Sequence, residues 1–523
     1  MNRFFRKSLK NRRPSLHTQM NRNQAYTAPL SPRLEENILQ VKHILGSPHD
    51  LVIREFAIAH SPHVCTLVCI DGLVDTELLN DKVMKTIQLL MPAVRENVPP
   101  TGDAIIEKLF QDVLSIIEGK KACTLADVLD AILTGDTALF VDGADLAVLI
   151  DSKGWKSRSI EEPVTEGLVR GPRDGFTEDI RTNTVRVRRR IRDPHLRFDG
   201  IQVGRRSKSD LIVAYIEGIV NPAIVQTVKQ RLATLDMDLI DESGYVEQWI
   251  EDNFLSPFPQ LQNTERPDKV AAALMQGRVA ILLDGTPFVL LAPVTFGMML
   301  QSPEDFYERW MVGSLARMLR YLAAFLAVFS PSLYIALVTF HPGLIPSDLA
   351  FSIAATREGV PFPAAVEALM MVITMELLQE AGIRLPRPIG QTIGIVGGLV
   401  IGEAAVSAGI VSPVMVIVVA ATAIASFAIP AYNVAITFRI IRFVIMLAAA
   451  AFGLYGVVLS FIAICIHLAN LKSVGVPYLT PFVPSLASDW KDLIFRAPIT
   501  LHTKRPNLLQ TKEIVRMDTG EQP

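Results

Sequence analysis

Four glutamates interrupt apolar segments in the second half of the chain, where an ionised side chain needs a physical reason. They are Glu367, Glu376, Glu380 and Glu403. A charge near the middle of a membrane-spanning helix costs about 2.5–3.5 kcal/mol, so each carboxylate requires water or a polar partner. We interpret them, with the hydroxyl residues Thr374 and Ser407, as candidates for lining or gating an ion pathway. The alternative is that a protonated or paired glutamate only holds neighbouring helices together.

Helical periodicity divides the first three carboxylates between two faces. In the segment 362–381, Glu376 and Glu380 share one face of a helix, whereas Glu367 lies on the other. Thr374 falls beneath Glu367 on that second face. A helix with polar groups on two sides suits a pore or a subunit interface, and an amphipathic helix lying on the membrane surface is the equal alternative.

A ladder of glycines at steps of four residues precedes the fourth carboxylate. Its members are Gly390, Gly394, Gly398 and Gly402. Small residues at this spacing let a neighbouring backbone approach closely in a membrane, so we predict helix packing along this stripe. Glu403 lies about 100° round the helix from the stripe, and Ser407 follows it one turn later. We therefore expect the Glu403 carboxylate to belong to an assembly of helices.

The composition of this region indicates a membrane. Between positions 321 and 471, eleven of 151 residues are charged, or about 7%, whereas the whole chain has 20%. Such a difference indicates a change of solvent from water to lipid. Apolar runs near the ~20 residues that a bilayer requires predict four to five spans, one ending near 340 and others at about 362–381, 388–409, 411–429 and 443–468.

Arginines at the ends of these runs predict the orientation of the protein. Arg317 and Arg320 precede the first span, which places the N-terminal half on the cytoplasmic side. Two further arginine pairs are expected to flank cytoplasmic turns, namely Arg384 with Arg387 and Arg439 with Arg442. Five spans would leave the basic C-terminal tail on the opposite side, so the number of spans stays open.

The first 300 residues alternate β-branched runs with polar helical stretches, and two pieces of this pattern occur twice. The segment 65–87 is a strand, an Asp–Gly turn and a helix, and 211–232 repeats that order with Glu–Gly at the turn. The segments 138–150 and 280–291 are both predicted hairpins that turn at Asp–Gly. The pattern predicts two similar α/β subdomains in tandem.

Other reactive side chains give weaker signals. His63, Cys65 and Cys69 would share one face of a strand, and His60 lies nearby, but no second cluster completes four zinc ligands. We therefore predict no metal. The chain has no nucleophile elbow, phosphate loop or catalytic triad, so we predict neither an enzyme nor a bound cofactor.

The segment 170–198 between the two repeats carries nine arginines against four acids. Arg186, Arg188 and Arg190 are its candidate basic patch. A site for anionic lipid or nucleic acid is one interpretation. A solvated connector whose arginines pair with acidic neighbours is favoured, because no ladder of aromatic residues accompanies the charges, and we predict no nucleic-acid partner.

The predicted fold class is α/β plus membrane α-helical, with two similar cytosolic α/β subdomains followed by a bundle of four to five transmembrane helices. The predicted division is a basic N-terminal extension at 1–44, subdomains at 45–185 and 186–300, a transmembrane domain at 301–484 and a basic tail at 485–523.

Several long motifs carry a family resemblance. They are IREF at 53–56, RGPRDGFTEDIRTN at 170–183, LLDGTPFVLLAPVTF at 282–296, SPEDFYERW at 302–310, the segment 394–430 and VPYLTPFVP at 476–484. In this order they resemble the A subunit of GerA-type spore germinant receptors of endospore-forming bacteria, from about residue 50 to the C-terminal tail.

The resemblance implies a multi-pass protein of the spore inner membrane, with its N-terminal domain on the cytoplasmic, spore-core side. It also implies a transporter-like B subunit and a lipoprotein C subunit as partners, and a homo-oligomeric ring that forms a nutrient-gated cation channel. Some A-subunit homologues amplify germination without a nutrient-sensing partner. A membrane transporter and a non-conducting scaffold are the alternatives; the repeat lies only in the soluble half, which argues against a transporter.

Overall fold

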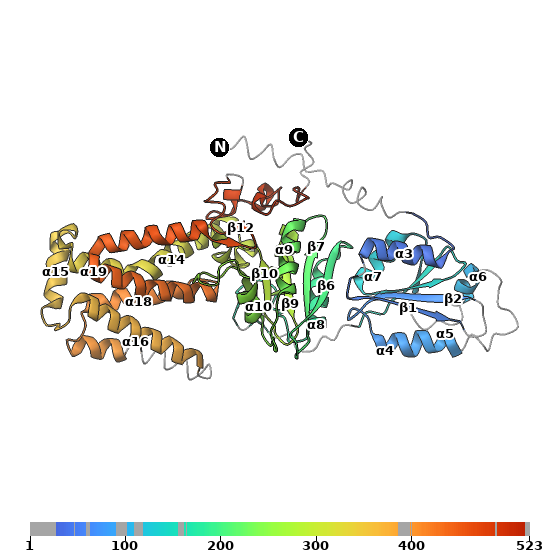
Figure 1. The fold of residues 1–523 in the computed structure, drawn as a ribbon, viewed down its shortest axis with the longest axis horizontal. Helices are drawn as coiled ribbons and strands as arrows, with labels where there is room; N and C mark the ends of the chain where they lie inside the picture. The colour runs from blue at the N-terminus through green and yellow to red at the C-terminus, as the bar shows by residue number, and fades with distance from the viewer. Residues whose placement is uncertain are drawn as a thin grey trace.

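The computed structural model describes residues 28–46, 48–58, 63–89, 102–108, 119–154, 162–163, 165–384, 398, 400–486 and 489–517. Figure 1 shows three parts in a row: an α/β unit from the N-terminal region, a second α/β unit in the middle, and a bundle of long helices. We call these parts the first unit, the second unit and the bundle.

The first unit is a five-stranded antiparallel sheet in the order β1-β2-β4-β5-β3. Its strands are β1 Leu51–Ala57, β2 Val64–Ile70, β3 Gly119–Ala122, β4 Thr137–Val141 and β5 Ala147–Ile150. Its helices are α3 Leu34–Leu45, α4 Thr76–Leu78, the π-helix η2 Leu79–Met84, α5 Lys85–Leu89, α6 Gly102–Lys108 and α7 Leu125–Thr134.

Helices cover both faces of this sheet, which explains why β2, one of its inner strands, is buried along almost all of its length. Along β2, Leu67 belongs to a core that includes residues of η2, α5 and α6, whereas Val68 belongs to a core with α3 and α7. Successive side chains of a strand point to opposite faces. A strand that is buried on both faces therefore lacks the usual polar–apolar alternation.

The second unit repeats this architecture with the sheet order β6-β7-β9-β10-β8. Its strands are β6 Leu196–Val203, β7 Ser209–Ile216, β8 Gln262–Thr264, β9 Val279–Leu283 and β10 Val289–Ala292. Its helices are α8 Ile180–Arg190, α9 Pro222–Ala233, α10 Ser243–Ile250 and α11 Pro267–Gln276. The two sheets connect their strands in the same order, so the predicted tandem repeat of α/β subdomains is present in the structure.

The turns that revealed the repeat have matching backbones. Gly72 and Gly218 follow the second strand of each unit with φ of 79° and 85°. Gly143 and Gly285 form the hairpin turns with φ of 85° and 90°. Positive φ favours glycine, so these acid–glycine pairs are turn chemistry, as the sequence predicted.

Two of the predicted boundaries cut through helices. Helix α3 lies within the predicted extension 1–44, yet its Val41 and Leu45 are fully buried in the first unit. Helix α8 contains the predicted boundary at 185/186 and packs against α11 of the second unit. The apolar residues of α3 are spaced for one buried face, and α8 combines five arginines with three apolar residues, so composition alone marks neither boundary.

The bundle contains α14 Trp310–Thr339, α15 Ser347–Arg357, α16 Ala364–Arg384, α18 Pro413–Phe427 and α19 Tyr432–Asn470, and residues 400–407 are also helical. In the described part of the chain, α14 and α19 are long and apolar enough to cross a membrane, and α18 is apolar but shorter. Helix α14 packs against both α18 and α19.

Short elements join the bundle to the second unit. They are α12 Phe296–Met299, α13 Glu304–Tyr307, and the hairpin of β11 Lys472–Ser473 with β12 Val476–Pro477. The Ser473 hydroxyl donates to the Gln260 carbonyl at 2.5 Å and accepts from the Val294 amide at 2.9 Å. The chain therefore leaves the bundle beside the same unit from which it entered.

Candidate functional site

Glu367 lies in the first turn of α16 and is fully buried. Its Oε1 accepts hydrogen bonds from the backbone amide and the hydroxyl of Ser412, both at 2.5 Å. Arg357 is 3.5 Å from the other carboxylate oxygen, and the hydroxyl groups of Tyr334 and Ser412 are 3.1 Å apart. Ser412 is the N-cap of α18, so Glu367 fixes the start of that helix.

Glu376 lies further along α16 and is paired with two arginines of α19. Its carboxylate is 3.6 Å from Arg439 and 3.3 Å from Arg442. Arg442 also donates to the Ala327 carbonyl of α14 at 2.7 Å and to the Ser426 hydroxyl of α18 at 2.8 Å. This ionic network joins four helices. The sequence predicted a turn at Arg439 and Arg442, but α19 begins at residue 432 and carries both arginines inside the helix.

The remaining candidates of the bundle lie in different surroundings. The Thr374 hydroxyl donates to the Met370 carbonyl of its own helix at 2.8 Å, and Glu380 is exposed on the same helix. Glu403 and Ser407 are both exposed on the segment 400–407. Within the described part of the chain, Glu403 has no hydrogen-bond or ion-pair partner. Glu367 and Glu376 thus form ion pairs within the bundle, whereas the side chains of Glu380 and Glu403 are exposed.

The glycine ladder packs against the bundle at one described position. A methyl group added to Gly402 would lie 3.6 Å from the Val416 side chain of α18, whereas one added to Gly398 would face open space. Gly390 and Gly394 lie outside the described residues. The stripe therefore meets α18 at Gly402 and leaves the monomer surface open at Gly398.

The arginines of α8 divide between two opposite sides of the helix. Arg188 is fully buried and donates to Asp50 of the first unit at 2.8 and 3.0 Å, with its guanidinium 4.8 Å from the Phe198 ring. Arg186 and Arg190 line a cavity instead. Residues two apart on a helix point to nearly opposite sides, whereas residues four apart share a face. The predicted patch of Arg186, Arg188 and Arg190 is therefore not one surface.

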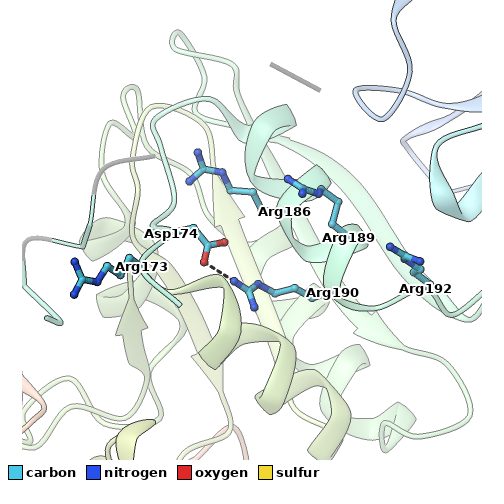
Figure 2. Close-up of a pocket in the computed structure, with 6 residues that line it drawn as sticks. All are labelled: Arg173, Asp174, Arg186, Arg189, Arg190 and Arg192. Carbon is cyan, nitrogen blue, oxygen red and sulfur yellow. Dashed lines mark hydrogen bonds and ion pairs between the residues drawn. The ribbon is translucent and has the colours of Figure 1, made fainter. Parts of the chain in front are cut away.

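We call this hollow the arginine cavity; it has a volume of about 560 Å³ (Figure 2) and is lined by Arg173, Asp174, Arg186, Arg189, Arg190 and Arg192. Arg190 donates to the Asp174 carboxylate at 2.5 Å. Partial burial, and then the like charge of Arg189, lower the pKa of Arg186, while Asp174 opposes that shift. The helical spacing of residues 186, 189 and 190 is the sequence signal that would have identified this face.

The cysteine and histidine candidates are dispersed. Cys65 and Cys69 are buried under the helices of the first unit, and burial raises their pKa values to about 12 and 11. The His63 ring lies 3.3 Å from the Asp142 carbonyl, and His60 is outside the described residues. Among the residues that the structure describes, no group of three His, Cys, Asp or Glu side chains gathers to hold a metal.

Three comparisons relate the chain to known proteins. A family model described as Bacillus/Clostridium GerA spore germination protein matches residues 39–508. Spore germination protein GerLA of Bacillus cereus is 51% identical over 484 residues, which cover 92% of this chain and 97% of that protein. Spore germination protein KA of Bacillus subtilis (strain 168) is 43% identical over 495 residues, which cover 94% of this chain and 90% of that protein.

One solved structure is also similar to this chain. It is the crystal structure of the N-terminal domain of the A subunit of the Bacillus megaterium spore germinant receptor GerK3. It shares 34% sequence identity, covers 52% of this chain and 98% of its own, and superimposes with a TM-score of 0.42.

Proposed function

Because the chain belongs to the GerA family of spore germination proteins, as its motifs predicted, we propose that it is an A subunit of a germinant receptor in the spore inner membrane. Its relatives are spore germination proteins, which supports a role in spore germination. In this proposal, copies of the chain form a ring that conducts cations in response to a nutrient. The partners implied by the family resemblance are a transporter-like B subunit and a lipoprotein C subunit.

The exposed carboxylate of Glu403 is the observation that carries the conducting part of this proposal. It lies on a helical segment of small and apolar residues and has no partner within the described part of the monomer. An ionised carboxylate facing lipid would be costly, so it requires water or another subunit. Gly398, one turn and a residue earlier, leaves space for a close neighbour. Both features favour an assembly of several copies of the chain around a water-filled path.

The paired carboxylates take a different role in this proposal. Glu367 holds the N-cap of α18, and Glu376 forms ion pairs with two arginines of α19. A buried charge that already has a partner inside the subunit is not available to a passing ion without breaking that pair. We therefore assign Glu367 and Glu376 to the scaffold of the bundle, and Glu403 with Ser407 to the ion pathway.

The path of the chain favours an even number of membrane crossings. Helix α14 starts and α19 ends beside the second unit, and the segment 489–517 contacts that unit again (Figure 1), since Arg505 donates to the Met275 carbonyl at 2.9 Å. This arrangement supports a basic tail on the same side of the membrane as the α/β units. An even count removes the charge conflict that five spans would create.

The decisive experiment is cation flux through the full chain reconstituted in liposomes with its partner subunits. Glu403→Gln removes the charge and keeps the shape, so we expect flux to fall by at least about tenfold while thermal stability stays unchanged. Glu367→Gln is the matched control, because it alters a buried carboxylate of the same bundle. We expect this variant to lower thermal stability, unlike Glu403→Gln.

Two outcomes would overturn the conducting role. Unchanged flux in Glu403→Gln would remove Glu403 from the pathway. A reconstituted receptor that supports germination but passes no cations would favour the non-conducting scaffold.

A further inference from the structure

We propose that the arginine cavity of the second unit binds a small soluble anion that carries two or more phosphate groups. This inference is independent of the conducting role proposed for the bundle, because the described residues that line the cavity all belong to the segment 173–192. It assigns a ligand class to a cluster that the ion pathway does not use.

The local fold explains why the arginines of α8 lie together, whereas the Arg173 side chain points away from them (Figure 2). Helix α8 carries Arg186, Arg189 and Arg190 at steps of three and one, which place them on one face. Arg192 follows the end of α8, and Arg173 comes from the segment that leads into it, on the opposite side of the cavity in Figure 2. The buried face of α8, with Val187 and Arg188, fixes the orientation of the helix. The arginine face is therefore held by packing on its far side.

The charges of the cavity favour an anion. Five guanidinium groups line it with one carboxylate, and that carboxylate is engaged by Arg190. The pKa of Arg186 is lowered, since burial and the neighbouring positive charge of Arg189 disfavour its charged form. Bound negative charge would offset the repulsion between Arg186 and Arg189. The structure shows no other carboxylate among the described residues that line the cavity.

The geometry favours phosphate groups over a simple counter-ion. A guanidinium offers parallel N–H donors that match two oxygens of a phosphate group, and several arginines match a ligand with more than one such group. The volume of about 560 Å³ lies within the range of small-molecule sites, about 300–1,000 Å³. One inorganic ion would leave most of this space and most of the arginines unused.

The cavity lies close to the junction between the second unit and the bundle. Arg170, three residues before Arg173, is 3.8 Å from Glu308, which lies two residues before the start of α14. A phosphate group is common to soluble anions and to lipid headgroups. We commit to an anion from solution and use lipid vesicles as a competing source in the test.

The test is isothermal titration of the full chain in detergent with inorganic pyrophosphate at low ionic strength. We expect one site per chain, weakening as salt is added. The double variant Arg186→Gln/Arg189→Gln should weaken binding by at least about tenfold, the effect of losing charge-assisted hydrogen bonds. The matched control is Arg205→Gln/Arg206→Gln, which removes two charges from exposed side chains of the same unit and should leave affinity unchanged.

A second variant changes affinity in the opposite direction and does not depend on the first. Asp174→Asn releases Arg190 and removes the carboxylate of the cavity, so it should tighten pyrophosphate binding several-fold. Asp236→Asn, which frees Arg205 at an exposed pair elsewhere, should change nothing.

Three results would overturn the proposal. They are an absence of pyrophosphate binding by the wild-type chain, equal losses in the cavity and control variants, and orthophosphate binding as tight as that of pyrophosphate. Competition by phosphatidylglycerol vesicles, but not by phosphatidylcholine vesicles, would replace the soluble anion with a lipid headgroup.

Discussion

The two α/β units share one architecture but differ in what their surfaces hold. Both sheets have the same strand order and matching left-handed glycines. The first unit is attached to the second through ion pairs and through Val185 of α8, which packs in the core of the first unit, whereas the second unit also holds the bundle and carries the arginine cavity. Since the cores are alike, the surface side chains decide what each copy of the fold does.

The contact between the units depends on arginines of the second unit. Arg188 reaches Asp50, and Arg197 donates to the carbonyls of Ile44 and Leu45 at the end of α3 while pairing with Glu217. A cation near the last carbonyls of a helix satisfies unpaired acceptors and the helix dipole. The second unit thus supplies hydrogen-bond donors for the last carbonyls of α3 in the first unit.

The largest effect on this contact is expected from Asp50→Asn. The change leaves the Arg188 guanidinium buried without its counter-charge, which typically costs about 3–5 kcal/mol. The midpoint of thermal unfolding of the full chain should fall, and limited proteolysis should cut the segment that joins the units earlier than in the wild type.

The matched control is Asp71→Asn, which removes the partner of Arg181 at the same contact. The Arg181 side chain is 70% exposed, so the loss should stay below about 1 kcal/mol. Equal destabilisation by Asp50→Asn and Asp71→Asn would contradict the importance of the buried pair.

The repeat could be predicted from the sequence because its signals are local. Strand patterns and acid–glycine turns require only a few neighbouring residues, and the structure places them where the pattern does. The strand order within each sheet could not be predicted, because β3 and β8 pair with strands that come later in the chain. Non-local pairing leaves no trace in local periodicity.

The partners of the bundle carboxylates were beyond sequence reasoning for the same reason. Glu376 meets Arg442, which lies 66 residues away, and Glu367 meets Ser412, 45 residues away. Each of these side chains alone looks like an unpaired polar group in an apolar helix. The division of the α8 arginines is different, because the helical spacing of 186, 188 and 190 is visible in the sequence and predicts opposite sides for Arg186 and Arg188.

A second difference between the units is the carboxylate of Glu247 on α10. Burial, and then the like charges of Glu251 and Glu242, raise the pKa of Glu247 to about 8. Helix α6, at the corresponding place in the first unit, carries Glu107, whose carboxylate accepts from Lys121 at the surface at 2.9 Å. The second unit therefore holds an acid that folding disfavours in its charged form.

This difference predicts a pH-dependent stability. Below pH 4.5, the ordinary value, Glu247 is protonated whether the chain is folded or unfolded, so it adds no penalty. Between 4.5 and about 8 the unfolded chain loses the proton first, so stability falls as pH rises, and above about 8 the penalty is complete. Glu247→Gln should stabilise the protein at pH 9, on the order of 2 kcal/mol given residual solvent contact, and leave it unchanged at pH 4.

Unfolding followed by tryptophan fluorescence, to which Trp249 of the same helix contributes, measures this effect. The control is Glu107→Gln, which should show no gain at pH 9 because that carboxylate is exposed and paired. A pH-independent effect of Glu247→Gln would contradict the raised pKa.

The smallest expected effect distinguishes two equivalent turns. Alanine at Gly218 should cost about 1 kcal/mol, because its φ of 85° disfavours a side chain but nothing lies within 4 Å of the added methyl group. Alanine at Gly72, with φ of 79°, would also place its methyl group 2.6 Å from the Val185 side chain of α8. Because valine is stiff and α8 is held by packing, we expect about 1 kcal/mol more at Gly72. As a control, alanine at the hairpin glycines Gly143 and Gly285, which both have space for a methyl group, should cost equal stability. If Gly72→Ala costs no more than Gly218→Ala, the contact between the units yields to a single methyl group.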